Sequence, residues 1–278
     1  MEPVEVLRER FPALEIRDVR AIEDGWDSLV LEVNGEYVFR FPRRPEVEAW
    51  VEREILLLPE LAEALPVEVP RFDFVARNGL LCVGYRKLVG AAAGADLSER
   101  AGDDLGRFLA ALHHFPVERA RSLGVPYFDP GAWRAHFEGF CGDLRQRVLP
   151  LLAQDERERA ESRFAEIDGF DFDPVLVHGD LGPEHVLVRD GRVAGVIDWS
   201  DARVGDPALD FAWCLHGTSE PTADAIARSY GLDPGTRERS LFYRRLGPWY
   251  EVVYGLETEQ PRFVESGVAG IRARLPSP

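Results

Sequence analysis

The sequence contains little cysteine. Its three cysteines, Cys82, Cys141 and Cys214, lie far apart in a chain of 278 residues, and none belongs to a C-x-x-C pair. An odd number of widely spaced cysteines argues against both a disulfide framework and a zinc site. We therefore expect a protein of the reducing cytoplasm.

The sequence also lacks a long apolar run. No stretch approaches the about 18 uncharged apolar residues that a membrane-spanning helix needs. The N-terminal segment MEPVEVLRERF alternates charged with apolar side chains and lacks the apolar core of a signal peptide. We expect no membrane partner. Apolar residues still make up 45% of the chain, enough for a sizeable core, and the length allows one large domain or two modest ones.

Basic residues are in the minority. The chain has 33 lysines and arginines against 49 aspartates and glutamates, which gives a net charge of −16. A field of this sign repels nucleic acid and anionic membranes, and it attracts cations. The acidic excess fits a surface that keeps the protein soluble, and it fits a site for a cationic substrate equally well. Charge alone does not choose between the two.

The first 90 residues show mostly β patterning with one helix. Asn34-Gly35 lies between two alternating segments, which is the strongest short signal for a hairpin. Apolar residues at helical spacing follow, and Pro66 and Pro70 end that pattern. The expected elements, in order, are two strands, a helix and two further strands at 29–33, 37–41, 46–64, 72–76 and 80–85.

The pattern becomes mainly helical after the GAAAG segment at 90–94, which is a candidate boundary between two lobes. Ser98 is a suitable N-cap for the first of these helices. Residues 131–168 contain two more helical runs, residues 174–200 return to β patterning, and the chain is helical again after residue 207.

The most informative stretch is 175–213, which contains a predicted hairpin with Asp190-Gly191 as its two-residue turn. The turn sets a register in which Arg189 faces Arg192. Continued back along the strands, that register places Val188, Leu187 and Val186 opposite Val193, Ala194 and Gly195. His185 and Asp198 then lie nearly opposite each other at the open end, within about 4.5–7 Å.

Asp180 precedes His185 by five residues on the same Gly- and Pro-rich loop. An aspartate, a histidine and a second aspartate therefore converge on one end of a sheet. A structural hairpin gains nothing from this arrangement, because like charges close together cost stability unless something neutralises them. We interpret the cluster as a functional site.

Two chemistries fit the cluster. In phosphoryl transfer, one carboxylate accepts the hydroxyl proton while others hold a metal on the nucleotide phosphates. In metal-dependent hydrolysis, His178, Asp180, His185 and Asp198 would all be ligands. Carboxylate-rich sites suit magnesium and histidine pairs suit zinc or iron. The spacing alone leaves both open.

A β-rich lobe followed by a helical lobe that carries the site is the architecture of a kinase. The motifs HGDLGPEH (178–185), IDW (197–199) and GDPALD (205–210) resemble those of the antibiotic phosphotransferases of the aminoglycoside/macrolide type, over nearly the whole chain. The resemblance implies an α+β, bilobal, protein-kinase-like fold. It implies a nucleotide-binding lobe at 1–90 and a catalytic and substrate-binding lobe at 91–278.

The resemblance also implies roles for residues of the second lobe. Asp180 resembles the catalytic aspartate, Asp198 the metal-binding aspartate, and His185 stands where the family usually has a metal-binding asparagine. Asp206 and Asp210 resemble the downstream pair that braces the catalytic loop, and His178 is expected to orient that loop.

In the first lobe, the resemblance implies a phosphate loop, a phosphate-binding side chain with its helix partner, and a hinge that holds the purine. The corresponding residues are Gly25, Asp27 and Ser28 for the loop, Arg40 and Glu54 for the pair, and Tyr85, Arg86 and Leu88 for the hinge. The implied cofactors are ATP or GTP and Mg²⁺, and the sequence does not choose between the nucleotides.

Two of these residues depart from the family pattern. Arg40 stands in place of a lysine, and its guanidinium retains the capacity to bind phosphate. His185 stands in place of an asparagine. An imidazole is a poorer ligand for magnesium than an amide oxygen and titrates near neutral pH, so activity is predicted to fall below pH of about 6.5.

The acceptor is expected to be a small molecule, cationic, such as an aminoglycoside or a macrolide bearing an amine. Candidate residues that contact it are Trp133, Glu138, Asp143 and Glu251. The alternatives are a kinase of a metabolite such as choline, homoserine or a sugar, a nucleotide-binding pseudokinase, and a metallohydrolase. Intact Asp180 and Asp198 argue against the pseudokinase. A monomer or weak dimer is expected.

Overall fold

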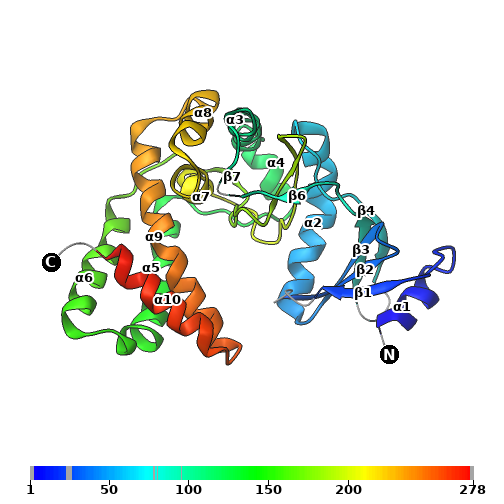
Figure 1. Ribbon diagram of the computed structural model, residues 1–278, viewed down its shortest axis with the longest axis horizontal. Helices are drawn as coiled ribbons and strands as arrows, with labels where there is room; N and C mark the ends of the chain where they lie inside the picture. Colours follow the sequence, from blue (N-terminus) through cyan, green and yellow to red (C-terminus); the bar gives the residue numbers. More distant parts are fainter. Residues whose placement is uncertain (1–2, 23–26, 78, 80, 95, 276–278) are drawn as a thin grey trace.

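The protein consists of two unequal parts. The computed structural model describes residues 3–22, 27–77, 79, 81–94 and 96–275. A small antiparallel sheet lies at one end of the long axis, and a larger, mostly helical part lies at the other (Figure 1). This arrangement confirms the predicted α+β, two-lobed fold. The division of the chain at residue 90 stays a prediction.

The small part contains a five-stranded antiparallel sheet in the order β1-β2-β3-β5-β4. Its strands are β1 (Val19–Ile22), β2 (Ser28–Val33), β3 (Tyr37–Pro42), β4 (Phe72–Ala76) and β5 (Cys82–Arg86). The predicted hairpin joins β2 to β3, and both Asn34 and Gly35 have the positive φ that a tight hairpin turn requires. Helix α1 (Pro3–Arg10) packs its buried Leu7 against the sheet residue Phe39.

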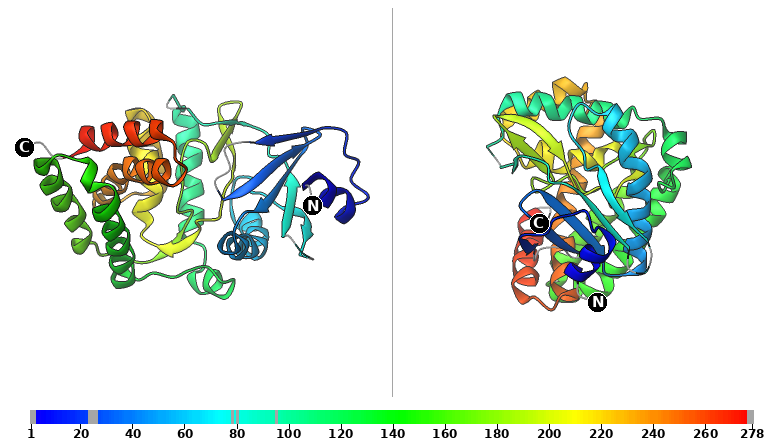
Figure 2. Two further views of the ribbon diagram at one scale, coloured as in Figure 1. Left: turned by 90° about the horizontal axis from the view of Figure 1, so that it is seen from below. Right: turned by 90° about the vertical axis from the view of Figure 1, so that its right-hand side faces the viewer.

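Helix α2 (Pro45–Ala64) joins the two parts. It begins with a proline, has Glu46 and Glu48 in its first turn, and ends just before Leu65-Pro66, as these residue types favour. The apolar residues of its C-terminal half, Leu57, Leu58 and Leu61, are buried in the same core as α3 (Glu99–His113). The left view of Figure 2 shows α2 between the sheet and the helical part.

The larger part is built mainly from helices. Ser98 caps α3 as predicted, because its Oγ accepts a hydrogen bond from the N–H of Ala101 at 3.2 Å. The further α-helices are α4 (Val117–Ser122), α5 (Pro130–Arg147), α6 (Gln154–Phe164), α7 (Phe211–His216), α8 (Glu220–Tyr230), α9 (Pro234–Glu257) and α10 (Pro261–Arg274). The 3₁₀ helices are η1 (Leu149–Leu151), η2 (Ala165–Gly169) and η3 (Pro207–Asp210).

Two apolar cores hold the helical part together. One joins α2 and α3 to the strands that carry the site, with Leu109 and Trp199 among its members. The other lies between α5, α6 and α9, around Trp133, Phe137 and Trp249. The larger part also contains short strands, most of which contribute buried apolar residues to the first core. They are β6 (Ala91–Ala92), β7 (Val175–Val177), β8 (Val186–Arg189), β9 (Arg192–Val196) and β10 (Arg203–Gly205).

The hairpin of β8 and β9 is present, but half of its predicted register is wrong. Arg189 pairs with Arg192 and Val188 with Val193, as predicted; Leu187 then pairs with Gly195, because Ala194 bulges out of the ladder. The bulge accommodates a third chain segment, since the N–H of Glu68 donates to the carbonyl of Ala194 at 3.0 Å and the N–H of Val196 donates to Glu68 at 2.9 Å.

Within the part of the chain that the structure describes, none of the helices combines the length and the apolar character that crossing a bilayer requires.

Gly205 provides a test of the second core. A Cβ atom at this position would lie 2.1 Å from the ring of the buried Trp133. We expect Gly205→Ala to lower the free energy of unfolding by about 1–3 kcal/mol, as overpacking does. Gly139 on the exposed face of α5 is a matched control, because a Cβ atom there would have no heavy atom within 4 Å. Gly139→Ala should stabilise by about 0.5–1 kcal/mol. Urea denaturation measures both changes, and equal midpoints for the two variants would contradict this packing.

Candidate active site

The loop after β7 carries Asp180 and is the predicted catalytic loop, and a buried carboxylate fixes its position. The N–H groups of His178 and Gly179 donate to Asp210 at 2.8 and 3.0 Å. The Nε2 of His113 on α3 lies 3.2 Å from the same carboxylate, and its Nδ1 lies 2.8 Å from the hydroxyl of Tyr230. Burial acts to raise the pKa of Asp210, but the hydrogen bond from His113 and that from Gly179 hold it below its ordinary value.

His178 orients the loop through both ring nitrogens. Its Nε2–H donates to the carbonyl of Ile197 at 3.0 Å, so Nδ1 is the acceptor for the N–H of Asp180 at 3.3 Å. The side chain is fully buried, and burial lowers its pKa. With both nitrogens engaged, His178 has no lone pair for a metal, which removes it from the four-ligand hydrolase site.

Gly179 allows the loop to lie close to the segment that follows β9. Its φ is +90°, and a Cβ atom there would lie 2.3 Å from the carbonyl oxygen of Asp201. Any other residue would be strained and would also clash with that backbone. The loop and the Asp198–Asp201 segment therefore depend on each other's position.

Asp206 does not brace the catalytic loop as the resemblance implies. Its carboxylate caps η3 through the N–H of Ala208 at 3.0 Å, and it accepts hydrogen bonds from Arg239 at 2.9 Å and the hydroxyl of Tyr243 at 3.0 Å. Asp206 therefore ties η3 to α9, whereas among the described residues the hydrogen bonds from the loop go to Asp210.

Asp180, His185 and Asp198 converge as the sequence predicts. The Nδ1 of His185 lies 3.7 Å from Oδ2 of Asp180, and its Nε2 lies 3.7 Å from Oδ2 of Asp198. Nδ1–H donates to the backbone carbonyl of Asp180 at 2.7 Å, so the Nε2 of the neutral ring presents its lone pair toward Asp198. The Asp180 side chain is 61% exposed and accessible to a substrate.

The three groups have shifted proton affinities. Partial burial, together with Asp201 and Asp198, raises the pKa of Asp180. Burial acts to raise the pKa of Asp198 as well, but Arg40 and His185 hold it below its ordinary value. Burial lowers the pKa of His185, yet Asp198 and Asp180 raise it by more, so its pKa lies above the ordinary histidine value. Asp180 suits a base and Asp198 suits a permanently ionised ligand.

Asp198 has the backbone strain typical of functional residues. Its φ is +64°, in the left-handed region that non-glycine residues rarely occupy, and its Oδ1 accepts a hydrogen bond from Ser200 at 2.7 Å. Among the described residues, no group of three or more His, Cys, Asp or Glu side chains is arranged to hold a metal. Asp198 and His185 fit a magnesium ion that takes its remaining ligands from nucleotide phosphates and water.

Arg40 and Glu54 form the predicted pair. Nη1 of Arg40 lies 2.8 and 3.1 Å from the carboxylate oxygens of Glu54, and Nη2 lies 4.0 Å from Asp198. Burial acts to lower the pKa of Arg40, but Glu54 and Asp198 raise it above its ordinary value. Because Glu54 is on α2 and Arg40 on β3, the pair aims a fixed positive charge from the small part toward Asp198.

Part of the predicted phosphate loop is described. Gly25 lies outside the described residues. Asp27 forms an ion pair with Arg44, and burial raises its pKa with the help of Asp201 and Asp198. Ser28 is buried, and within the described residues its Oγ has no hydrogen-bond partner.

The predicted hinge follows β5. Tyr85 is buried and pairs with Val38 of β3, whereas Arg86 is exposed and pairs with Tyr37. The side chain of Leu88 lies over Gly195, where a Cβ atom would be 2.6 Å from its Cδ2. The hinge therefore adjoins the strand that leads to Asp198, and its purine contacts stay a prediction.

The placement of Trp133 contradicts its predicted contact with substrate. Its side chain is 0% exposed in the core beside α9, and its Nε1–H donates to the hydroxyl of Tyr243 at 2.7 Å. The prediction for Trp133 rested on its helical spacing, and that spacing marks the buried face of α5.

The three acidic candidates for substrate contact already have partners. Glu138 pairs with Arg145 at 2.8 Å, and Asp143 pairs with Arg147 at 3.0 Å. Glu251 accepts a hydrogen bond from Ser266. Each would have to exchange its partner for a substrate amine, so their role stays a prediction.

Sequence reasoning missed an aromatic pair beside the catalytic loop. Tyr250 of α9 is 49% exposed and stacks on Phe140 of α5, with ring centroids 4.4 Å apart and an interplanar angle of 13°. Partial burial raises the pKa of Tyr250, and Asp201 and Asp180 also act on its hydroxyl. Phe140 and Tyr250 are far apart in sequence, so no local pattern connects them. In the sequence, the available indication was the tyrosine between Trp249 and Glu251.

The comparisons with known proteins agree with this geometry. A family model described as the phosphotransferase enzyme family matches residues 18–242. The chain belongs to this family. It is 32% identical over 149 residues to viomycin phosphotransferase of Streptomyces vinaceus, a match that covers 51% of the chain and 52% of that relative. It is 31% identical over 124 residues to the homoserine kinase of Phenylobacterium zucineum (strain HLK1), covering 40% and 35%. The chain thus aligns with about half or less of these two relatives.

Two solved structures of the family resemble nearly the whole chain. The GDP and kanamycin complex of APH(2″)-IIIa has a TM-score of 0.87 and 26% identity, covering 98% of this chain and 97% of that one. The macrolide 2′-phosphotransferase MphH of Brachybacterium faecium has a TM-score of 0.77 and 26% identity, covering 100% of both. These likenesses confirm the predicted kinase-like fold and the predicted family.

His185 is expected to make the site sensitive to acid. Its raised pKa means that the ring is protonated, and its Nε2 unable to bind a cation, over a wider range than for an ordinary histidine. We expect kcat/KM to fall on the acid side with a midpoint above pH of about 6.5. His185→Asn should remove this limb and leave only the loss at lower pH that the carboxylates cause. A pH–rate profile measures the change, and an identical acid limb in the variant would exclude His185 as its source.

Proposed function

We propose that the protein is a nucleotide-dependent kinase that transfers the γ-phosphoryl group to a hydroxyl of a small molecule. The observation that carries the proposal is the convergence of Asp180, His185, Asp198 and Arg40 on one point. Membership of the phosphotransferase enzyme family supports it, as do solved relatives in complex with GDP or ATP. Mg²⁺ held by Asp198 and His185 would neutralise charge on the phosphates.

Asp180 is the proposed base. It accepts the proton of the acceptor hydroxyl as the hydroxyl oxygen bonds to the γ-phosphorus. The bond from that phosphorus to the bridging oxygen then breaks, which releases the nucleoside diphosphate. The raised pKa of Asp180 improves the match to a hydroxyl proton. The N–H of Asp180 donates to Nδ1 of His178 and the N–H of His178 donates to Asp210, and these hydrogen bonds hold the loop in position.

Arg40 is the proposed phosphate-binding residue. Its guanidinium is held by Glu54 and lies within 4.0 Å of Asp198. The guanidinium donors left free by Glu54 suit phosphate oxygens, and the charge is permanent because arginine does not deprotonate in proteins. Arginine in place of lysine at position 40 therefore keeps a positive charge that can bind phosphate and pair with Glu54.

The proposed acceptor is an amine-bearing antibiotic of the aminoglycoside, macrolide or viomycin class. The names of the relatives support this range. The exposed ring of Tyr250 offers a flat apolar face beside Asp180. The net charge of −16 favours a cationic ligand over an anionic one.

A homoserine-type metabolite is the second candidate. Homoserine kinases of several organisms match 40% or more of the chain at 29–34% identity. Homoserine also presents an amine and a hydroxyl to the same base. Homoserine is acyclic, so it has no ring that could stack on Tyr250.

A turnover screen tests the reaction. We expect consumption of ATP or GTP with at least one compound among aminoglycosides, macrolides, viomycin and homoserine, and Asp180→Asn should lower kcat by about 10²–10⁴. Asp155→Asn, at an exposed carboxylate on α6, is the control and should retain full activity. Full activity of Asp180→Asn would refute the assignment of the base, and turnover with homoserine alone would favour the second candidate.

Tyr250 tests the acceptor class. If a substrate ring packs on it, Tyr250→Ala should raise the acceptor KM by about 2–10-fold, since such a contact with an aromatic face contributes about 0.5–1.5 kcal/mol. The KM for nucleotide should not change, and Tyr250→Phe should behave as the wild type. Tyr127→Ala is the matched control, because Tyr127 is similarly exposed but contacts Arg121 instead. Equal acceptor KM values in the two alanine variants would exclude stacking on Tyr250.

A further inference from the structure

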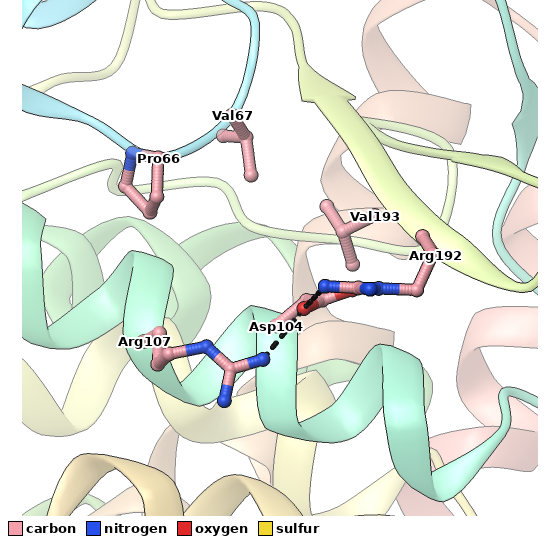
Figure 3. Close-up of a pocket in the computed structure, with 6 residues that line it drawn as sticks. All are labelled: Pro66, Val67, Asp104, Arg107, Arg192 and Val193. Atoms are coloured by element: carbon pink, nitrogen blue, oxygen red, sulfur yellow. Dashed lines mark hydrogen bonds and ion pairs between the residues drawn. The ribbon is translucent and has the colours of Figure 1, made fainter.

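A small pocket lies at the turn end of the β8–β9 hairpin, away from the catalytic residues. Its volume is about 130 Å³, and its lining residues are Pro66, Val67, Asp104, Arg107, Arg192 and Val193. In Figure 3, Arg107 and Asp104 come from α3, Arg192 and Val193 from β9, and Pro66 and Val67 from the loop after α2. Arg192 is at the opposite end of the strand from Asp198, roughly 15–20 Å along it at about 3.3 Å per residue.

Charge in this pocket is unbalanced. Asp104 is buried, and it accepts hydrogen bonds from Nη2 of Arg107 at 2.7 Å and Nη2 of Arg192 at 2.6 Å. Burial acts to raise the pKa of Asp104, but Arg192 and Arg107 hold it below its ordinary value, so it is ionised at neutral pH. Two guanidiniums against one carboxylate leave one positive charge at the pocket.

Asp104 engages only part of the N–H donors of the two guanidinium groups. The side chains of Arg107 and Arg192 are 54% and 43% exposed. Each guanidinium carries five N–H groups, and within the described residues Asp104 is the acceptor for both. Figure 3 shows the two guanidiniums approaching Asp104 from opposite sides, with Pro66 and Val67 across the pocket. The remaining donors therefore border the pocket, while the far wall is apolar.

We propose that this pocket binds a small oxyanion, with free phosphate as the species of matching size and charge. Guanidinium groups bind phosphate through paired hydrogen bonds, and the local positive charge stands out in a chain with a net charge of −16. The pocket volume of about 130 Å³ leaves room for a small free anion. The bound anion reduces the repulsion between Arg107 and Arg192 and stabilises the junction of α3 with the hairpin.

Thermal unfolding at constant ionic strength tests this site. We expect phosphate to raise the Tm of the wild type above that in chloride by about 2 °C or more at several times its Kd. Arg107→Gln removes donors and charge from the pocket but leaves the nucleotide site unchanged. The part of the phosphate-dependent shift that is due to the pocket should disappear in this variant.

The control is Arg121→Gln. Arg121 is 47% exposed and pairs with Glu118 at i−3, as Arg107 pairs with Asp104, but it does not line the pocket. Its phosphate-dependent shift should equal that of the wild type. An absent shift in the wild type, or equal shifts in the wild type and Arg107→Gln, would overturn the proposal. Calorimetric titration with phosphate gives the same decision independently of unfolding, because Arg107→Gln should lose a binding event that Arg121→Gln retains.

Discussion

The geometry of the candidate active site depends on the hydrogen bonds that the buried carboxylate of Asp210 accepts. This carboxylate accepts the N–H groups at the start of the catalytic loop and is itself bound to His113 of α3. The ring of His178 in turn accepts a hydrogen bond from the N–H of Asp180 and donates one to the carbonyl of Ile197. The proposed base and the proposed metal ligand are thus positioned by one hydrogen-bonded chain. A buried network of this kind is stable only when each member is satisfied.

Much of the site could be predicted because its residues are close in sequence. The two-residue turn at Asp190-Gly191 set the half of the hairpin register next to the turn, and the motifs placed Asp180, His185 and Asp198 at its open end. Ser98, Asn34 and Gly35 were also predictable, because capping and turn preferences act over a few residues. The Arg40–Glu54 pair required the family resemblance, since it joins a strand to a helix.

The errors arise where distant segments decide the outcome. The bulge at Ala194 exists because the loop at Glu68 pairs with β9, a contact that no hairpin rule contains. Trp133 was predicted to contact the acceptor, but it is buried beside α9. Asp206 shares a motif with Asp210, yet Arg239 engages it. The roles of His113 and Tyr250 could not be predicted, because α3 and α9 come close to the loop only in the folded structure.

The pairing of Glu68 with β9 has a mechanical consequence. It joins the segment after α2 to the strand that leads to Asp198, and Leu57, Leu58 and Leu61 bury the same end of α2 in the core of the helical part. Helix α2 is therefore anchored to the larger lobe at its C-terminal end, while Arg40 belongs to the smaller one. Val47 and Val51 also pack the N-terminal half of α2 against Val83 of the sheet, so this one helix links the two lobes, and the Arg40–Glu54 ion pair fastens the sheet to that link.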